Sequence, residues 1–181
     1  MNDKSLSKFL SLVLRHAPET IDLELDSEGW ANCSELIAAA NLKGKDFDLE
    51  QLKRVVAESD KQRFGFSSDG LFIRANQGHS VEVDLKLQQL TPPAVLFHGT
   101  VERFLESIRR TGLEKGKRHH VHLSADRSTA DIVGKRRGDA IVLTIDAAAM
   151  VHRGHHFFQS NNGVWLCDHI PPDFISFPAN I

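Results

Sequence analysis

Residues 64–80 read Phe-Gly-Phe-Ser-Ser-Asp-Gly-Leu-Phe-Ile-Arg-Ala-Asn-Gln-Gly-His-Ser, and this stretch decides the fold of the first half of the chain. Alternating apolar residues flank the turn-forming residues 67–70, a pattern that predicts a β-hairpin. The second strand ends at Ile73, and a row of hydrogen-bond donors follows it directly. The stretch therefore combines a fold signal with a candidate binding site.

A helix is predicted over residues 5–16, where apolar residues recur at helical spacing. Asp3 or Ser5 would cap its N-terminus. Arg15 and His16 would fall in its last turn, aimed at the point where the strand that carries Arg74 also ends. The alternative is that these two cations only complement the helix dipole.

Two more helices are predicted before the hairpin. One begins at Asn32, after a short strand, and the other begins at Asp48, because both residues start a capping-box-like pattern. Helix, strand, helix, helix and hairpin is the order of a winged helix. Residues 1–90 are therefore predicted to form a winged-helix lobe.

The second half of the chain has a different pattern, in which strands predominate. Strands are predicted at residues 95–97, 120–123, 140–145, 157–158 and 164–166, and helices at 101–110 and 128–133. Residues 91–181 are predicted to form a compact mixed β lobe, and the whole chain an α+β protein.

The composition indicates a globular protein of 181 residues with a net charge of −2. That charge argues against a protein that coats nucleic acid through its overall field. No apolar run approaches the roughly 20 residues of a membrane span, and Lys8 and Arg15 interrupt any signal-peptide core. We expect a cytoplasmic monomer. Cys33 and Cys167 lie far apart in apolar surroundings, so neither a disulfide framework nor a cysteine-based zinc site is predicted.

The donors after Ile73 suit an anionic ligand. Arg74 offers a fixed fork of N–H groups, and neutral donors follow it. These neutral donors are Asn76, Gln77, His79 and Ser80. The alternative is a polar loop that happens to follow a hairpin.

Further anion-binding signals lie in the second half. Basic residues cluster at 109–110, 115–120 and 135–137, which suggests a localised anion site, although each run could equally be a solvated surface. Residues 98–100 read His-Gly-Thr and supply an imidazole, an unhindered backbone and a hydroxyl. This set suits a nucleotide ribose, but three residues specify little on their own.

The residues also bear on a metal site and on a site for hydride transfer. His152, His155 and His156 could hold a metal at helical spacing, but no carboxylate or thiol completes a ligand set, so no metal site is predicted. The chain also lacks a Gly-x-Gly-x-x-Gly turn followed by an acidic residue, so a site for hydride transfer is not indicated.

Several motifs together carry a family resemblance that covers nearly the whole chain. They lie at residues 7–18, 26–30, 73–80, 98–100, 120–124 and 162–166. With these motifs the sequence resembles the NAD-dependent RNA (tRNA) 2′-phosphotransferase family. The Arg-Ala-Asn-Gln-Gly-His-Ser string and the Leu-Arg-His helix end are the specific ones.

The resemblance implies a fold and a reaction. The second lobe should be similar to ADP-ribosyltransferases and bind NAD as a co-substrate, without a metal. The first lobe should bind the RNA 2′-phosphate, of the kind left at a tRNA splice junction. That phosphate attacks C1″ of the nicotinamide ribose, and the ribose 2″-OH then attacks the phosphorus. The products are 2′-OH RNA, ADP-ribose 1″,2″-cyclic phosphate and nicotinamide.

The resemblance also implies roles for individual residues. The residues implied to contact the transferring phosphate are Arg15, His16, Arg74 and Arg136, with Arg137 left open as an alternative to Arg136. Those implied to bind NAD are His98, Gly99, Thr100, His122 and Ser124. Those expected to bind the RNA are Asn76, Gln77, His79 and Ser80, with Arg118 as a pyrophosphate or RNA contact.

Other functions remain to be separated from this one. Residues 161–165 contain no glutamate, which disfavours transfer of ADP-ribose to proteins, whereas transfer to terminal phosphates of nucleic acids stays possible. A winged-helix DNA-binding regulator would use residues 48–58, which are too acidic to read DNA well. A metal-dependent phosphoesterase would need the histidine cluster.

Overall fold

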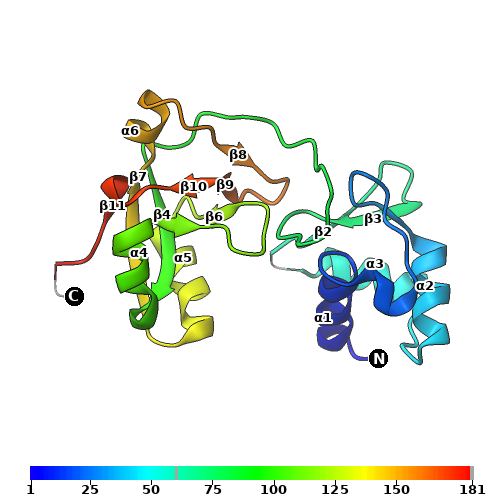
Figure 1. The fold of residues 1–181 in the computed structure, drawn as a ribbon. Coiled ribbons are helices and arrows are strands. Elements are labelled where there is room, and N and C mark those ends of the chain that lie inside the picture. The colour runs from blue at the N-terminus through cyan, green and yellow to red at the C-terminus, as the bar shows by residue number, and fades with distance from the viewer. Residues whose placement is uncertain (60, 180–181) are drawn as a thin grey trace. The chain divides into compact units, whose positions relative to one another are not determined.

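The computed structural model describes residues 1–59 and 61–179. The chain divides into two compact units, Met1–Lys86 and Leu87–Ile181 (Figure 1). Six α-helices and several small antiparallel sheets make up the described residues. The prediction of a mixed helix-and-strand protein is confirmed. None of the described helices is both long and apolar enough to cross a membrane.

The first unit places its helices around a three-stranded sheet. In chain order its elements are α1 (Asp3–Val13), a 3-10 helix (Pro18–Ile21), β1 (Ala31–Asn32), α2 (Cys33–Leu42), α3 (Leu49–Ala57), β2 (Phe64–Phe66) and β3 (Phe72–Ala75). The antiparallel sheet has the order β1-β3-β2, and Ala31 lies opposite Ile73. Its core includes fully buried Leu6, Leu10, Leu36, Leu52 and Ile73.

The helix starts in this unit follow local capping chemistry. The side chain of Asn32 accepts hydrogen bonds from the backbone at the start of α2, and Asp48 does the same for α3, as predicted. The predicted cap of α1 was wrong. Asn2 caps this helix instead, with its Oδ1 accepting from Ser5 N at 2.9 Å, since an asparagine oxygen serves as well as an aspartate or serine oxygen.

The end of α1 also differs from the prediction. The helix ends at Val13 with Leu14 as its C-cap, so Arg15 and His16 lie just beyond it and not in its last turn. The backbone N–H of His16 still reaches Leu12 O at 2.9 Å, which closes a final turn. Helical continuation is then blocked, because Pro18 disfavours the α conformation in the residue before it.

The second unit is built from short antiparallel strands. Its strands are β4 (Val95–Val101), β5 (Leu113–Glu114), β6 (Val121–Leu123), β7 (Ala140–Asp146), β8 (Phe158–Gln159), β9 (Trp165–Cys167), β10 (His169–Ile170) and β11 (Ile175–Ser176). Its helices are α4 (Leu105–Thr111), α5 (Arg127–Gly134) and α6 (Ala147–His152), with 3-10 helices at Glu102–Phe104, Lys135–Arg137 and Pro172–Phe174. The sheets have the orders β11-β7-β4, β6-β9-β8 and β10-β5.

The chain joins this unit slightly earlier than residue 91, where the sequence places the boundary. Leu90 N donates to Phe157 O at 2.9 Å, and Gln89 forms a β-bridge with Phe158. These backbone contacts tie the segment before Thr91 to the second unit, which begins at Leu87.

Strand β4 corrects two predictions about residues 95–110. The sequence places a strand at 95–97 and a helix from residue 101, whereas β4 continues through Val101 and α4 begins only at Leu105. Continuous pairing with β7 explains the difference, because His98 lies opposite Leu143 and Thr100 opposite Ile141. The His-Gly-Thr triplet therefore lies inside a strand and does not follow one.

Gly99 is a glycine for a packing reason. A Cβ at this position would lie 1.8 Å from Ala130 O of α5, and that distance leaves no room for any side chain. Helix α5 thus packs directly on the backbone of β4 (Figure 1). Only a glycine lets the backbone of α5 come this close to β4. This packing explains the glycine without the close approach of a ligand.

Candidate functional site

Arg74 lies in β3 on the face opposite the core, between buried Ile73 and Ala75. Its guanidinium carbon stacks 4.4 Å from the ring centroid of Trp30. Its Nη1 donates to Glu28 O at 3.4 Å and lies 3.8 Å from Glu28 Oε2. Only 13% of the side chain is exposed. Arg74 is therefore held by an aromatic face and one weak ion pair.

The guanidinium of Arg15 lies at the start of the neighbouring strand β2. Its Nη2 donates to Arg63 O at 3.3 Å, and its Cζ lies 5.7 Å from the ring centroid of Phe64. Arg63 O also accepts from Asn76 N at 2.9 Å. The carbonyl oxygen of Arg63 thus accepts from Arg15, which lies just beyond α1, and from Asn76, which follows β3.

His16 meets the same segment through Ser80. Its Nδ1 lies 3.0 Å from Ser80 Oγ, and Ser80 N donates to Arg15 O at 2.8 Å. The structure therefore brings Arg15 and His16 to the chain that follows β3, where the sequence placed the polar donors. Cationic and hydroxyl groups gather at this end of the sheet.

The remaining donors of the segment are less accessible than the sequence suggests. Asn76 is buried and its Nδ2 donates to Gln62 O at 2.5 Å, which pins the hairpin. His79 is 1% exposed, and a Cβ on Gly29 would lie 3.4 Å from its Nε2. Gln77 is half-buried. Their roles toward RNA stay predictions, whereas the positions of Asn76 and His79 show that both contribute to the interior of the unit.

In the second unit, β4 and β6 bring together most of the residues expected to bind NAD. His98 Nδ1 lies 3.0 Å from His122 O, and Phe97 and Ser124 exchange two backbone hydrogen bonds of 2.9 Å. Thr100 is 5% exposed, so its hydroxyl lies mostly inside the unit. The two histidines and Ser124 form a local cluster.

The hydrogen bond to His122 fixes the tautomer of His98. A carbonyl oxygen can only accept, so Nδ1 must carry the proton. Burial lowers the pKa of His98 below its usual value, and the charges of Arg137 and Arg118 lower it further, against the opposing effect of the bond to His122. The imidazole is therefore neutral near pH 7, which leaves Nε2 as an acceptor.

This pKa shift predicts a pH-dependent stability. The unfolded chain protonates His98 near its ordinary pKa of about 6.5, whereas the folded chain resists protonation. Below that pH the unfolded state binds more protons, so the free energy of unfolding should fall as the pH is lowered. Urea unfolding at pH 7.5 and 5.5 measures the loss, which should be smaller in His98→Asn. Equal losses in both proteins would contradict the assignment.

The same electrostatic effects place Arg118 and Arg137 near His98. Arg137 lies in the 3-10 helix Lys135–Arg137, and its Cζ is 5.8 Å from the ring centroid of Phe104. Arg136 lies in the same turn and is exposed. The sequence favours Arg136 for the phosphate, whereas the charge of Arg137 is one of those that lower the pKa of His98.

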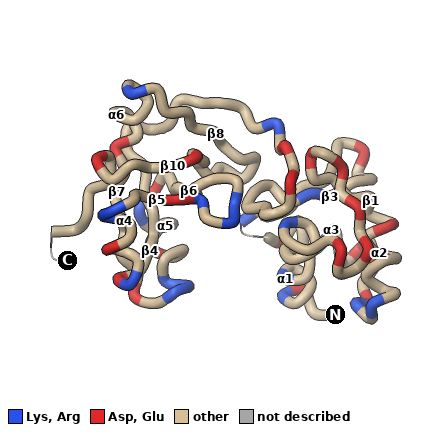
Figure 2. The backbone as a smooth tube through the Cα atoms, in the orientation of Figure 1, with Lys and Arg blue, Asp and Glu red and all other residues tan. Residues whose placement is uncertain are grey.

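Positive charge is unevenly distributed within each unit. Figure 2 shows Lys and Arg in the loop before β6, and Asp and Glu around β1. Arg74 is the one basic residue of β3. The histidines at 152–156 are separated, since His152 closes α6 and His155 stacks edge-on with Phe174. Among residues 1–59 and 61–179, no three His, Cys, Asp or Glu side chains are grouped to bind a metal.

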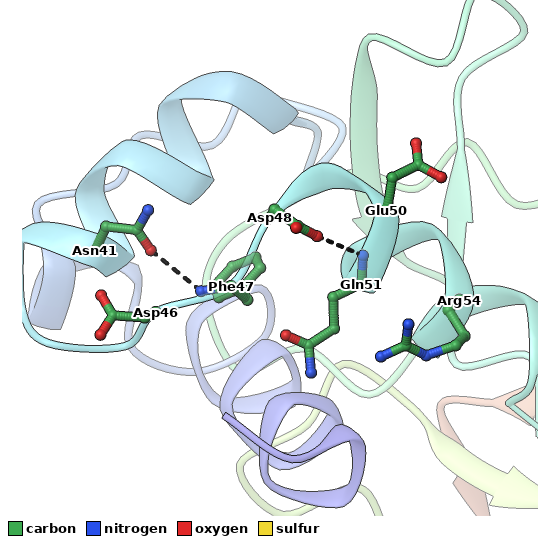
Figure 3. A pocket seen from close by; sticks show the side chains of 7 residues that line it. All are labelled: Asn41, Asp46, Phe47, Asp48, Glu50, Gln51 and Arg54. Atoms are coloured by element: carbon green, nitrogen blue, oxygen red, sulfur yellow. Dashed lines mark hydrogen bonds between the residues drawn. The ribbon is translucent and has the colours of Figure 1, made fainter.

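A separate hollow in the first unit contains none of the expected site residues. Figure 3 shows its lining, which comes from the end of α2, from the turn between α2 and α3, and from α3. Its polar groups already have structural partners, because Asn41 accepts from Phe47 N, Asp48 caps α3 and Arg54 pairs with Asp3. The polar residues that line this hollow stabilise the local fold, so the surroundings of Arg74 are the better candidate for a functional site.

Two residues beside Arg74 are absent from the set expected from the sequence. Trp30 and Glu28 belong to the stretch at residues 26–30, but neither was assigned a role there. The pairing of β1 with β3 would have revealed Trp30, because Ala31 lies opposite Ile73 and Trp30 therefore falls opposite Arg74. The register of two paired strands cannot be derived from one sequence.

The fold and site define a two-unit helix-and-strand protein with basic side chains gathered around the strand β3. A family model described as RNA 2′-phosphotransferase, Tpt1/KptA family, matches residues 1–169. A probable RNA 2′-phosphotransferase of Rhodopirellula baltica is 55% identical over 176 residues, which cover 97% of this chain and 96% of that protein.

Two further relatives carry the same description. The Agrobacterium fabrum protein is 55% identical over 174 residues, covering 96% of this chain and 94% of the relative. The Fusobacterium nucleatum protein is 50% identical over 177 residues, covering 97% and 99%. The chain belongs to the RNA 2′-phosphotransferase, Tpt1/KptA family, as the sequence motifs predict.

Proposed function

We propose that this protein removes an internal 2′-phosphate from RNA by transferring it to NAD. The observation that carries the proposal is the position of Arg15 and His16, which contact Ser80 in the segment that follows β3, the strand that contains Arg74. Membership of the RNA 2′-phosphotransferase family supports the same conclusion. The RNA of a tRNA splice junction is the proposed substrate type.

We assign the two halves of the reaction to the two units. Met1–Lys86, with three helices and a three-stranded sheet, would be a winged helix that binds the RNA 2′-phosphate. Leu87–Ile181, with its short antiparallel strands, would be similar to ADP-ribosyltransferases and bind NAD. Of the residues expected to contact the phosphate, Arg15, His16 and Arg74 belong to the first unit and Arg136 to the second. All residues expected to bind NAD belong to the second unit.

The first step needs little help from the protein. A phosphate monoester is largely a dianion at pH 7, because its second pKa is about 6. It can therefore attack C1″ of the nicotinamide ribose without a general base, and nicotinamide leaves with the bonding electrons. The task of the arginines is to hold the phosphate, which a permanently charged planar guanidinium does well.

The second step places more demand on the site. The ribose 2″-OH attacks the phosphorus, and the RNA 2′-oxygen leaves and takes up a proton. Negative charge builds on the phosphoryl oxygens, so fixed cations lower the barrier. Arg15, His16, Arg74 and Arg136 are the residues we assign to this stabilisation. His16 is the member that could also move a proton.

The cluster on β4 and β6 has the chemistry that NAD requires. The neutral His98 presents Nε2 as an acceptor for a ribose hydroxyl, and Ser124 adds a hydroxyl of its own. Arg118 and Arg137, whose charges lie near this imidazole, suit a pyrophosphate. Gly99 would contribute only backbone atoms, since α5 covers the space of its missing side chain.

The proposal is tested with an RNA that carries one internal 2′-phosphate. The RNA should lose its phosphate only when NAD is present. A chelator should not change the rate, because the arginines supply the positive charge that a divalent ion would otherwise bring. Phosphate loss without NAD would instead indicate a hydrolase. ADP-ribosylated ends on a 5′- or 3′-phosphorylated RNA would indicate the alternative activity on terminal phosphates.

A further inference from the structure

The turn that precedes β1 is rigid and points two side chains at Arg74. Asp26 Oδ1 accepts from Glu28 N at 2.8 Å and from Trp30 N at 2.9 Å, and Asp26 N donates to Trp30 O at 2.9 Å. Gly29 has a φ of 82°, which a glycine adopts without strain. The backbone on both sides of the turn is therefore fixed before any ligand binds.

The strand register then determines what the turn meets. Ala31 of β1 lies opposite Ile73 of β3, so Trp30 falls opposite Arg74 in this antiparallel pair. Side chains of directly opposed residues lie on the same face and touch. The indole and the guanidinium stack at 4.4 Å as a consequence, on the face away from the core.

We propose that Trp30 is a positioning residue that holds the Arg74 guanidinium for the RNA 2′-phosphate, and that Glu28 occupies its anion position until the phosphate replaces it. The inference deepens the proposed function and rests on it. Neither residue belongs to the cationic set described above.

The stack restricts the plane of the guanidinium but leaves its edge able to donate. An unsupported arginine side chain would lose much rotamer freedom on binding a phosphate. Because the indole already restricts the guanidinium in the free protein, less entropy is lost on binding, and bidentate hydrogen bonding to the phosphate is favoured. In residues 1–59 and 61–179, hydrogen bonding to this guanidinium is confined to Nη1, so Nη2 and Nε can serve a ligand.

Glu28 has the geometry of a weak, replaceable partner. Its Oε2 lies 3.8 Å from Arg74 Nη1, beyond hydrogen-bond length, and its side chain is 41% exposed. At this distance, and with the carboxylate partly open to solvent, the pair contributes little stabilisation. A phosphate dianion offers two charges and short bidentate bonds, so it should displace the carboxylate readily. The backbone oxygen of Glu28 would keep its bond to Arg74 in either state.

The experiment measures binding without NAD, so it does not depend on turnover. Two short RNAs, identical except for one internal 2′-phosphate, are titrated into the full chain, and the ratio of their dissociation constants gives the preference for the phosphate. The variants are Trp30→Leu, Trp30→Phe and Glu28→Gln. Phe72→Leu is the matched control, since Phe72 is an exposed aromatic residue of the same strand β3.

Trp30→Leu should reduce the preference about tenfold, because a partly desolvated cation–π contact is worth about that factor. Trp30→Phe, which keeps an aromatic face, should stay within about threefold of the wild type. Glu28→Gln should strengthen the preference, since the competing charge is gone. An unchanged preference in a folded Trp30→Leu protein overturns the role of Trp30, and a weakened one in Glu28→Gln overturns that of Glu28.

A double-mutant cycle separates positioning from general damage to the fold. Arg74→Ala removes the guanidinium altogether, whereas a lysine would keep a cation for the indole. If Trp30 acts through Arg74, Trp30→Leu should have no further effect in the Arg74→Ala background. Additive losses would mean that Trp30 acts through the fold alone. A wild-type protein with no preference for the 2′-phosphate would contradict the proposed function itself, and the inference with it.

Discussion

Arg74→Ala is expected to reduce the conversion of 2′-phosphorylated RNA by about 100- to 1000-fold, the loss that follows removal of one preorganised donor. In the proposed mechanism Arg74 donates where charge develops, and its guanidinium is already held by Trp30. The fold should survive, because the side chain lies outside the core, on the face opposite Ile73. The defect should appear in kcat more than in KM for NAD.

Single-turnover rates and thermal unfolding together check this result. Arg54→Ala is the matched control, since this arginine of the same unit is engaged in an exposed pair with Asp3 and lies outside the Arg74 site. The control should retain its rate. An Arg74→Ala protein within threefold of the wild type would refute the assignment of this residue.

Arg136→Ala is expected to separate the two chemical steps. The 2′-phosphate brings its own charge to the first step, so attack at C1″ should continue in the variant. The second step builds charge on the phosphoryl group and should slow by about 100- to 1000-fold when a stabilising cation is lost. ADP-ribosylated RNA should then accumulate. Gel electrophoresis detects it as a slowly migrating band.

Arg137→Ala provides both the control and the rival assignment. Its charge lies near His98, so we expect it to weaken the binding of NAD without accumulation of the intermediate. The KM for NAD should rise while the slow band stays absent. Accumulation in Arg137→Ala but not in Arg136→Ala would reverse the roles of the two residues.

Much of the local structure of the first unit could be predicted because its signals are local. The predicted hairpin at 64–73 is present, because residues 67–70 favour a tight turn that reverses the direction of the chain. Asn32 and Asp48 cap the helices that they were expected to cap. The cap of α1 was misplaced, because Asn2, Asp3 and Ser5 offer equivalent oxygens within one turn.

The second unit could be predicted less well because its elements depend on distant partners. Strand β4 extends through Val101 only because β7 pairs with it along its whole length. The two-residue strands β5 and β10 have no detectable period, and α6 was missed although Asp146 caps it. The packing of α5 on Gly99 was not predicted, because the backbone of Ala130 is distant in sequence, and the role of Gly99 toward NAD stays a prediction.

The candidate site also has parts that could be predicted and parts that could not. The sequence predicts that the end of the first helix and the segment after β3 come together, and Ser80 indeed contacts Arg15 and His16. The burial of Asn76 and His79 was not expected, because donors in a loop are usually exposed. The stack on Trp30 depends on strand register, which no local pattern encodes.

The central claim is that the RNA 2′-phosphorus leaves on ADP-ribose, and following that phosphorus tests it most directly. An RNA with a radiolabelled internal 2′-phosphate is incubated with the protein and NAD, and the labelled products are separated. The label should appear in ADP-ribose 1″,2″-cyclic phosphate, one for one with nicotinamide and dephosphorylated RNA. Label released as inorganic phosphate, or retained on RNA while NAD is consumed, would contradict the account.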